Sequence, residues 1–137
     1  MPPTPGRLHP DPEVVGRLAD ALERAERPLI LAGRGAVVSG AEPALLALAE
    51  RTGALLATTV CGHGLFAESP WSLGICGGFS SPIADELIRE SDFIAGLGAS
   101  FTQWTTKRGT LIAPGTTVAQ IDIEVAKLGY QMPIQYA

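Results

Sequence analysis

Short, mostly apolar runs alternate along this chain with segments of helical periodicity, and this alternation restricts its fold more than any other feature. The runs cover residues 29–32, 54–57, 93–97 and 117–122. Runs of this length that are apolar on both faces are typical of parallel strands covered by helices on both sides. The pattern therefore predicts an α/β fold: a doubly wound, Rossmann-like parallel sheet of about six strands with helices on both faces.

Between the runs, three segments carry helix start signals. Asp11 is suited to cap a helix that begins at the following proline, because its side chain can accept from the first free N–H groups. A second helix is expected from about Ala41, and a third from the Ser-Ser-Pro sequence at 80–82. Residues 59–79 are expected to form a long glycine-containing loop, and a sixth strand is expected to begin near Ile134 and to be cut short.

Prolines crowd the start of the chain, where five of its eleven fall within the first twelve residues. Such a stretch forms neither a helix nor a central strand and is typical of a semi-rigid linker. We expect residues 1–11 to be a Pro-rich linker and residues 12–137 to be a domain excised from a longer protein, called the parent below.

Composition excludes several classes of protein. With 46% hydrophobic and 18% charged residues, the 137-residue chain can bury a core, which excludes wholesale disorder. Its net charge of −4 lacks the positive excess of a nucleic-acid binder, so no such partner is expected. No apolar run approaches the ~20 residues that span a bilayer, so no membrane association is expected. The two cysteines lack metal-ligand spacing and predict free thiols in a cytoplasmic protein.

Three of the expected strands end in residues that suit a ligand, and in doubly wound sheets ligands bind outside the carboxyl ends of the strands. Small residues at 33–35 and 98–100 would let a ligand approach the backbone, and Asp122 could accept both hydroxyls of a ribose. The alternatives are tight turns at the first two places and a helix cap at the third. The glycine spacing matches neither GxGxxG nor a phosphate-binding P-loop. The candidate cofactor-binding residues are Gly33, Gly35, Gly98, Ala99, Ser100 and Asp122.

Catalytic and metal-binding residues are not predicted in this chain. Cys61 and His63 invite interpretation as a nucleophile and its base, but residues two positions apart rarely meet productively, and no acid is evident to orient the histidine. Lys107 and Arg108 could face an anionic ligand, although adjacent charges in a loop are usually solvated. No pair of carboxylates lies in a context that suggests acid–base catalysis.

Six segments occur in an order that is familiar from a known family. They are RPLILAGRGA at 27–36, LAERTG at 48–53, ATTVCGHGLF at 57–66, LGICGG at 73–78, SDFIAGLGAS at 91–100 and QIDIE at 120–124. Together they resemble the central domain of thiamine diphosphate-dependent enzymes, and within these the acetolactate synthase group. The likeness extends over roughly residues 12–134.

This resemblance implies that the parent is a homo-oligomeric enzyme of three α/β domains that uses thiamine diphosphate and Mg²⁺ to decarboxylate or join 2-keto acids. The first domain of such enzymes carries the catalytic glutamate, and the third carries the Mg²⁺–diphosphate motif, Gly-Asp-Gly followed by Asn. This chain has no Gly-Asp dipeptide and no asparagine. It is therefore expected to be inactive alone, with the flanking cofactor-binding domains of the parent as its partners.

The resemblance also implies that this domain can bind FAD or an ADP-containing nucleotide. Carried over by position, the contacts would come from the six candidate residues above and from Ile123. FAD-binding acetolactate synthases carry a segment of the type Arg-Phe-Asp-Asp-Arg where this chain has SFTQWTTKR at 100–108, and this departure argues against FAD. Two alternatives stay open: a free-standing NAD(P)- or FAD-binding module of the same fold, and a structural spacer with an empty cleft.

Overall fold

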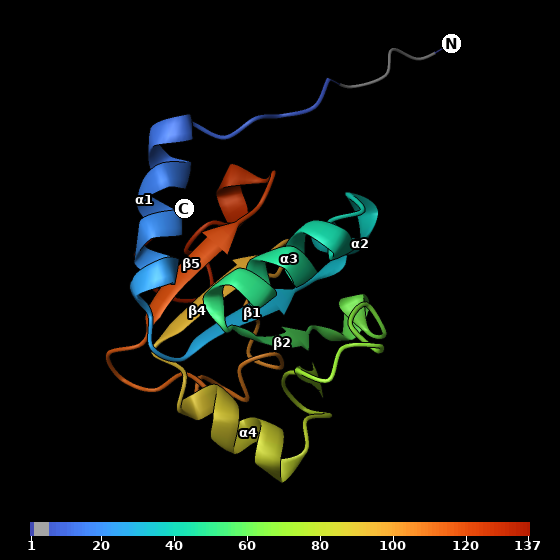
Figure 1. The fold of residues 1–137 in the computed structure, drawn as a ribbon, viewed down its shortest axis with the longest axis vertical. Helices are drawn as coiled ribbons and strands as arrows, with labels where there is room; N and C mark the ends of the chain where they lie inside the picture. Colours follow the sequence, from blue (N-terminus) through green and yellow to red (C-terminus); the bar gives the residue numbers. More distant parts are fainter. Residues whose placement is uncertain (2–5) are drawn as a thin grey trace.

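A single parallel sheet forms the centre of the structure, a computed structural model that describes residues 1 and 6–137. Its strands lie in the order β3-β2-β1-β4-β5, and every neighbouring pair is parallel (Figure 1). The α/β class and the parallel sheet are thus confirmed. The linker expected over residues 1–11 lies partly outside the described residues. The strands are β1 Pro28–Ala32, β2 Leu55–Thr58, β3 Ser72–Ile75, β4 Phe93–Leu97 and β5 Thr117–Ile121.

Helices cover both faces of the sheet, as the sequence predicts (Figure 1). On one face, Leu22 packs with Phe93, and Leu45 packs with Ile30. On the other face, Ile88 belongs to the cluster that contains the remaining inward residues of β1 and β4. The helices are α1 Pro12–Arg24, α2 Arg34–Val38, α3 Glu42–Thr52 and α4 Pro82–Arg89, with short 3₁₀ turns η1 Val60–Gly62 and η2 Val125–Lys127.

Two of the helix starts show why the sequence signals were reliable. The Asp11 carboxylate accepts a hydrogen bond from the N–H of Glu13 (2.8 Å), and the Ser81 hydroxyl accepts one from the N–H of Ala84 (3.2 Å). In both helices a proline occupies the first turn, where its missing N–H removes no intrahelical hydrogen bond. The two helices therefore begin where the caps predict.

The structure differs from the sequence-based expectation at two strands. The expected loop 59–79 contains β3, an edge strand that pairs with β2 through a shift in register. The expected sixth strand is reduced to one isolated parallel bridge between Ala119 and Tyr136. A backbone hydrogen bond joins Gln120 to Tyr136 there (3.0 Å), whereas the N–H of Val118 donates to the side chain of Gln135 (2.7 Å) and not to a backbone carbonyl. The sheet therefore has five strands, close to the expected number of about six.

Candidate functional site

The carboxyl ends of β1, β4 and β5 lie side by side in register. Ala32 is opposite Leu97, and Leu97 is opposite Ile121, so the residues that follow each strand share one edge of the sheet. From β1 the chain proceeds to β2 and β3 on one side, whereas β4 leads to β5 on the other. The boundary between β1 and β4 is therefore the topological switch point, where doubly wound proteins bind their ligands. We call this edge, formed by residues 33–35, 98–100 and 122–127, the rim.

At the switch point the glycines of the rim contact one another. The N–H of Gly33 donates to the carbonyl of Leu97 (2.9 Å), and the N–H of Gly35 donates to that of Gly98 (3.3 Å). A Cβ atom on Gly33 would lie 2.2 Å from the carbonyl oxygen of Gly98, and a Cβ atom on Gly35 would lie 2.7 Å from the Cα of Gly98. Close packing of two turns thus accounts for these glycines. A ligand at the rim would have to be held mainly by side chains.

Asp122 and Ser100 supply polar groups at the rim. One carboxylate oxygen of Asp122 accepts from the N–H of Glu124 (2.9 Å), so the side chain closes a turn after β5 and caps no α-helix. Its second oxygen has no hydrogen bond within the described part of the chain. Ser100 is half-buried, and Ile123 leaves 78% of its surface exposed. Ala99 is buried and contributes only backbone atoms.

Two cationic side chains that the sequence interpretation missed also belong to the rim. Arg34 lies between the two glycines that follow β1 and is exposed. Lys127 lies 2.9 Å from the carboxylate of Glu124, which raises the pKa of the ammonium group by hydrogen bonding and by charge. Asp122 raises this pKa further, while the positive charge of Arg34 lowers it. The sequence did contain a signal for Arg34, because it lies between two glycines that follow an expected strand. No sequence feature marked Lys127 as part of the rim.

The buried side chain of Gln120 connects two of the segments that form and follow the rim. Its amide N–H donates to the carbonyl of Ala99 (3.1 Å), and its amide oxygen accepts from the N–H of Gly129 (2.9 Å). The turn after β4 is thereby tied to the segment after η2. A lone amide within an apolar strand was the available sequence signal, because a buried polar side chain needs partners for its hydrogen bonds.

The segment after β4 holds the two cations that could have faced an anionic ligand. Lys107 instead pairs with Asp85 of α4, with 2.5 Å between Nζ and Oδ2, and Ser80 donates to the other oxygen of Asp85. Burial raises the pKa of Asp85, but these hydrogen bonds and the charges of Lys107 and Arg89 outweigh it, so the pKa lies below its ordinary value. Arg108 remains exposed.

The two cysteines are free thiols in different surroundings. Cys61 is exposed, and no hydrogen bond joins it to His63 within the described residues, so the structure gives no support for a nucleophile–base pair. Cys76 is buried and donates to the carbonyl of Thr105 (3.3 Å). Burial raises the pKa of Cys76 to about 12, and the negative charge of Asp85 adds to the effect. This thiol is therefore held protonated and unreactive.

Nowhere in residues 1 and 6–137 do three His, Cys, Asp or Glu side chains gather as they would around a metal ion. None of the helices in this part of the chain combines the length and apolar character needed to cross a bilayer.

The sequence of the chain matches that of a known protein family. The family described as "Thiamine pyrophosphate enzyme, central domain" matches residues 15–137. The chain belongs to this family. The match includes all five strands and every residue of the rim, which confirms the resemblance seen in the six sequence segments.

The relatives of this central domain are much longer proteins. The probable acetolactate synthase large subunit of Methanocaldococcus jannaschii is 34% identical over 119 residues, which are 86% of this chain and 20% of that protein. The acetolactate synthase large subunit of Parasynechococcus marenigrum is 33% identical over 91% of this chain and 21% of its own length. A 3D-(3,5/4)-trihydroxycyclohexane-1,2-dione hydrolase of Bacillus velezensis is 32% identical over 76% of this chain and 16% of its own length. The chain thus spans about a fifth of the length of its acetolactate synthase relatives.

Proposed function

We propose that this central domain serves a homo-oligomeric, cytoplasmic enzyme that decarboxylates or joins 2-keto acids, as acetolactate synthases do. Support comes from the relatives, two of which are named acetolactate synthase large subunits. Thiamine diphosphate, when bound, supplies the nucleophilic carbon for such reactions. The motif that holds the Mg²⁺–diphosphate complex in such enzymes, Gly-Asp-Gly followed by Asn, does not occur in this sequence, so the flanking domains of the parent would hold this cofactor and Mg²⁺. The role of this chain is then to connect these domains, and alone it is inactive.

A domain exchange tests this role. The chain replaces the corresponding fifth of the Methanocaldococcus jannaschii relative, and acetolactate formation from pyruvate is measured with thiamine diphosphate and Mg²⁺. We expect the chimaera to form acetolactate and the 137-residue chain alone to form none. The intact relative is the positive control. Turnover by the isolated chain, or a folded chimaera that binds thiamine diphosphate but forms no product, would contradict the proposal.

We further propose that the rim binds an ADP-containing nucleotide. The observation that supports this is that Arg34, which follows β1, and Asp122 and Lys127, which follow β5, lie on the same edge of the sheet. The free carboxylate oxygen of Asp122 is suited to ribose hydroxyls, and the two cations are suited to a diphosphate. At residues 100–108 this chain lacks the acidic pair of the FAD-binding enzymes, which argues against FAD. We therefore propose a nucleotide with an ADP moiety and without a flavin as the ligand of the rim.

A structural spacer is the second candidate, and one observation favours it. The N–H groups of Gly33 and Gly35 already donate to the carbonyls of Leu97 and Gly98 at the end of β4. The glycines therefore need no ligand to account for them, and the rim can be complete when empty. The two candidates differ in whether any nucleotide stabilises the chain.

Thermal unfolding with added nucleotide decides between them. We expect ADP at a hundredfold excess over its dissociation constant to stabilise the chain by about 2.7 kcal/mol. Asp122→Asn and Arg34→Gln should each reduce the affinity, whereas Asp20→Asn, an exposed change on α1, should not. Stabilisation by NADP but not by ADP or FAD would favour a free-standing nucleotide module. No shift with ADP, FAD, CoA or NADP would establish the spacer.

A further inference from the structure

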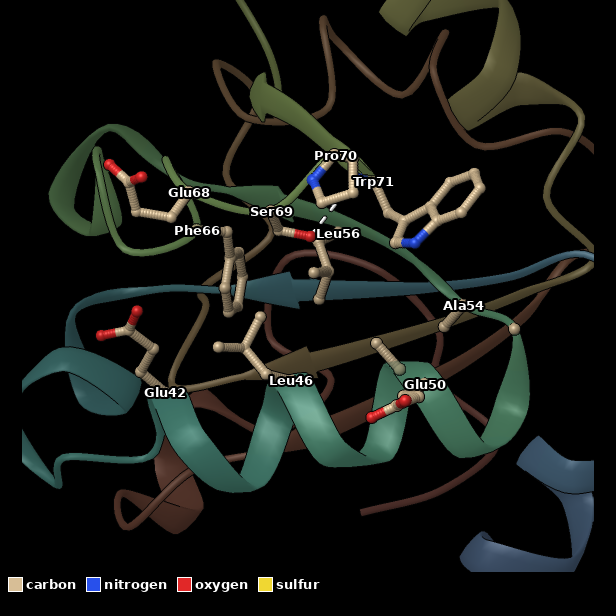
Figure 2. A pocket seen from close by; sticks show the side chains of 12 residues that line it. Glu42, Leu46, Glu50, Ala54, Leu56, Phe66, Glu68, Ser69, Pro70 and Trp71 are labelled. Carbon is tan, nitrogen blue, oxygen red and sulfur yellow. Dashed lines mark hydrogen bonds between the residues drawn. The ribbon is translucent and has the colours of Figure 1, made fainter.

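A groove runs along α3, away from the rim. Its walls are α3 and the segment 66–71, which leads into the edge strand β3 (Figure 2). The groove has a volume of about 540 Å³, within the range of sites that bind ligands. Its floor is apolar and contains Leu46, Ala49, Leu56 and Phe66. No residue of the rim lines it, so its occupant is independent of the proposed nucleotide.

The floor combines buried and accessible apolar surface. Phe66 and Leu56 are 2% and 1% exposed, so they are fixed in the core, and Leu46 is half-buried between them and solvent. Trp71 leaves 65% of its surface exposed on the wall opposite α3. A large exposed aromatic ring beside an apolar depression is the arrangement in which bulky side chains of a partner bind.

Three carboxylates lie at the edge of the groove. Glu42 of α3 and Glu68 of the facing segment lie toward one end, and Glu50 lies toward the end near Trp71 (Figure 2). None of the three forms a salt bridge with a lysine or arginine of the described residues, although five other ion pairs are present there. Glu50 follows Glu42 by eight positions, which is about 12 Å along a helix.

This charge distribution defines the chemistry of the occupant. If a bound segment had acidic residues at its ends, they would be repelled by the three unpaired carboxylates at the edge of the groove. Lysine or arginine side chains at both ends would instead pair with Glu42, Glu68 and Glu50, and one of them could stack on the indole of Trp71. We propose that the groove binds a basic segment of a partner protein, in which bulky apolar side chains lie between two cations about 12 Å apart.

The test uses a peptide that meets this description. In the extended peptide Ac-KALFK-amide, four steps of about 3.3 Å separate the lysines by about 13 Å. Ac-EALFE-amide is the control of opposite charge. The chain has two tryptophans, Trp71 in the groove and Trp104 outside it, so the two indole N–H signals in a ¹H–¹⁵N spectrum separate local from general effects. We expect the basic peptide to shift the Trp71 signal alone and the acidic peptide to shift neither.

Charge-matched variants establish that the groove carboxylates are responsible. A triple variant with Glu42→Gln, Glu50→Gln and Glu68→Gln should bind the basic peptide about tenfold more weakly. A second triple variant, with Glu13→Gln, Glu26→Gln and Glu86→Gln, removes the same charge outside the groove. Its affinity for the basic peptide should fall less than about twofold. Single Glu68→Gln, in a turn outside the helices, is measured as well in case the triple variant is unstable.

Several outcomes would overturn the proposal. The first is that the Trp71 signal does not shift at millimolar basic peptide. The second is that both triple variants lose the same affinity for this peptide. The third is that free lysine amide binds as tightly as the peptide, which would make the groove a site for small cations. A peptide-free Trp71 shift that grows with protein concentration and disappears in the groove variant would identify a second copy of this chain as the occupant instead.

Discussion

Replacing Gly98 by alanine is expected to lower the free energy of unfolding by about 3 kcal/mol. Gly98 has φ +61°, a conformation that costs an L-residue about 1 kcal/mol. A Cβ atom there would lie 2.4 Å from the Cα of Gly35 and 2.7 Å from the backbone N of Ala36. Both obstacles are backbone, so relief requires the turn after β1 to move away from the turn after β4. The steric cost therefore adds to the conformational one.

Gly40 provides the matched control for this substitution. It has φ +66°, close to that of Gly98, and a Cβ atom there would meet nothing within 4 Å. Gly40→Ala should therefore cost only the conformational part, about 1 kcal/mol. Urea unfolding followed by circular dichroism measures both variants. Equal losses for Gly98→Ala and Gly40→Ala would show that the two turns do not interlock at the switch point.

The fold could be predicted from the sequence wherever apolar runs were continuous. The run 93–97 is the observed β4, and 29–32 lacks only the first residue of β1. Both strands lie in the middle of the sheet and are buried on both faces, which is what makes such runs continuous. β3 could not be found in the same way. It is an edge strand with partly exposed residues, and its sequence Ser-Leu-Gly-Ile has no apolar run.

The location of the rim could also be predicted, but its internal contacts could not. Parallel strands end at one edge, so Gly33, Gly98 and Asp122 had to lie on the same side of the sheet. That Gly33 contacts Gly98 depends on β1 being the neighbour of β4, and no local sequence pattern specifies strand order. For the same reason the pairing of Asp85 with Lys107, 22 residues apart, left no trace in the sequence.

The ion pair between α4 and the segment after β4 leads to the second large effect. Asp85→Asn is expected to destabilise the chain by about 3 kcal/mol, because it leaves the half-buried Lys107 ammonium without its negative partner. Lys107 also has φ +47°, so the pair holds its segment in an unfavourable backbone conformation. Glu90→Gln is the control: it breaks an exposed pair with Arg27 at 4.0 Å and should cost less than about 0.5 kcal/mol.

The pH dependence of this effect separates charge from packing. Because the pKa of Asp85 in the folded chain lies below its ordinary value of 3.8, folding favours the ionised form, and the stabilisation is fully present above pH 3.8. It is lost as the pH falls below 3.8 through the folded-state pKa. The difference in unfolding free energy between the unaltered chain and Asp85→Asn, measured by urea unfolding, should therefore be constant near neutrality and shrink in acid. A difference that persists unchanged at the lowest pH at which both fold would mean that the substituted amide disturbs packing, and that the charge of the ion pair does not stabilise α4 against this segment.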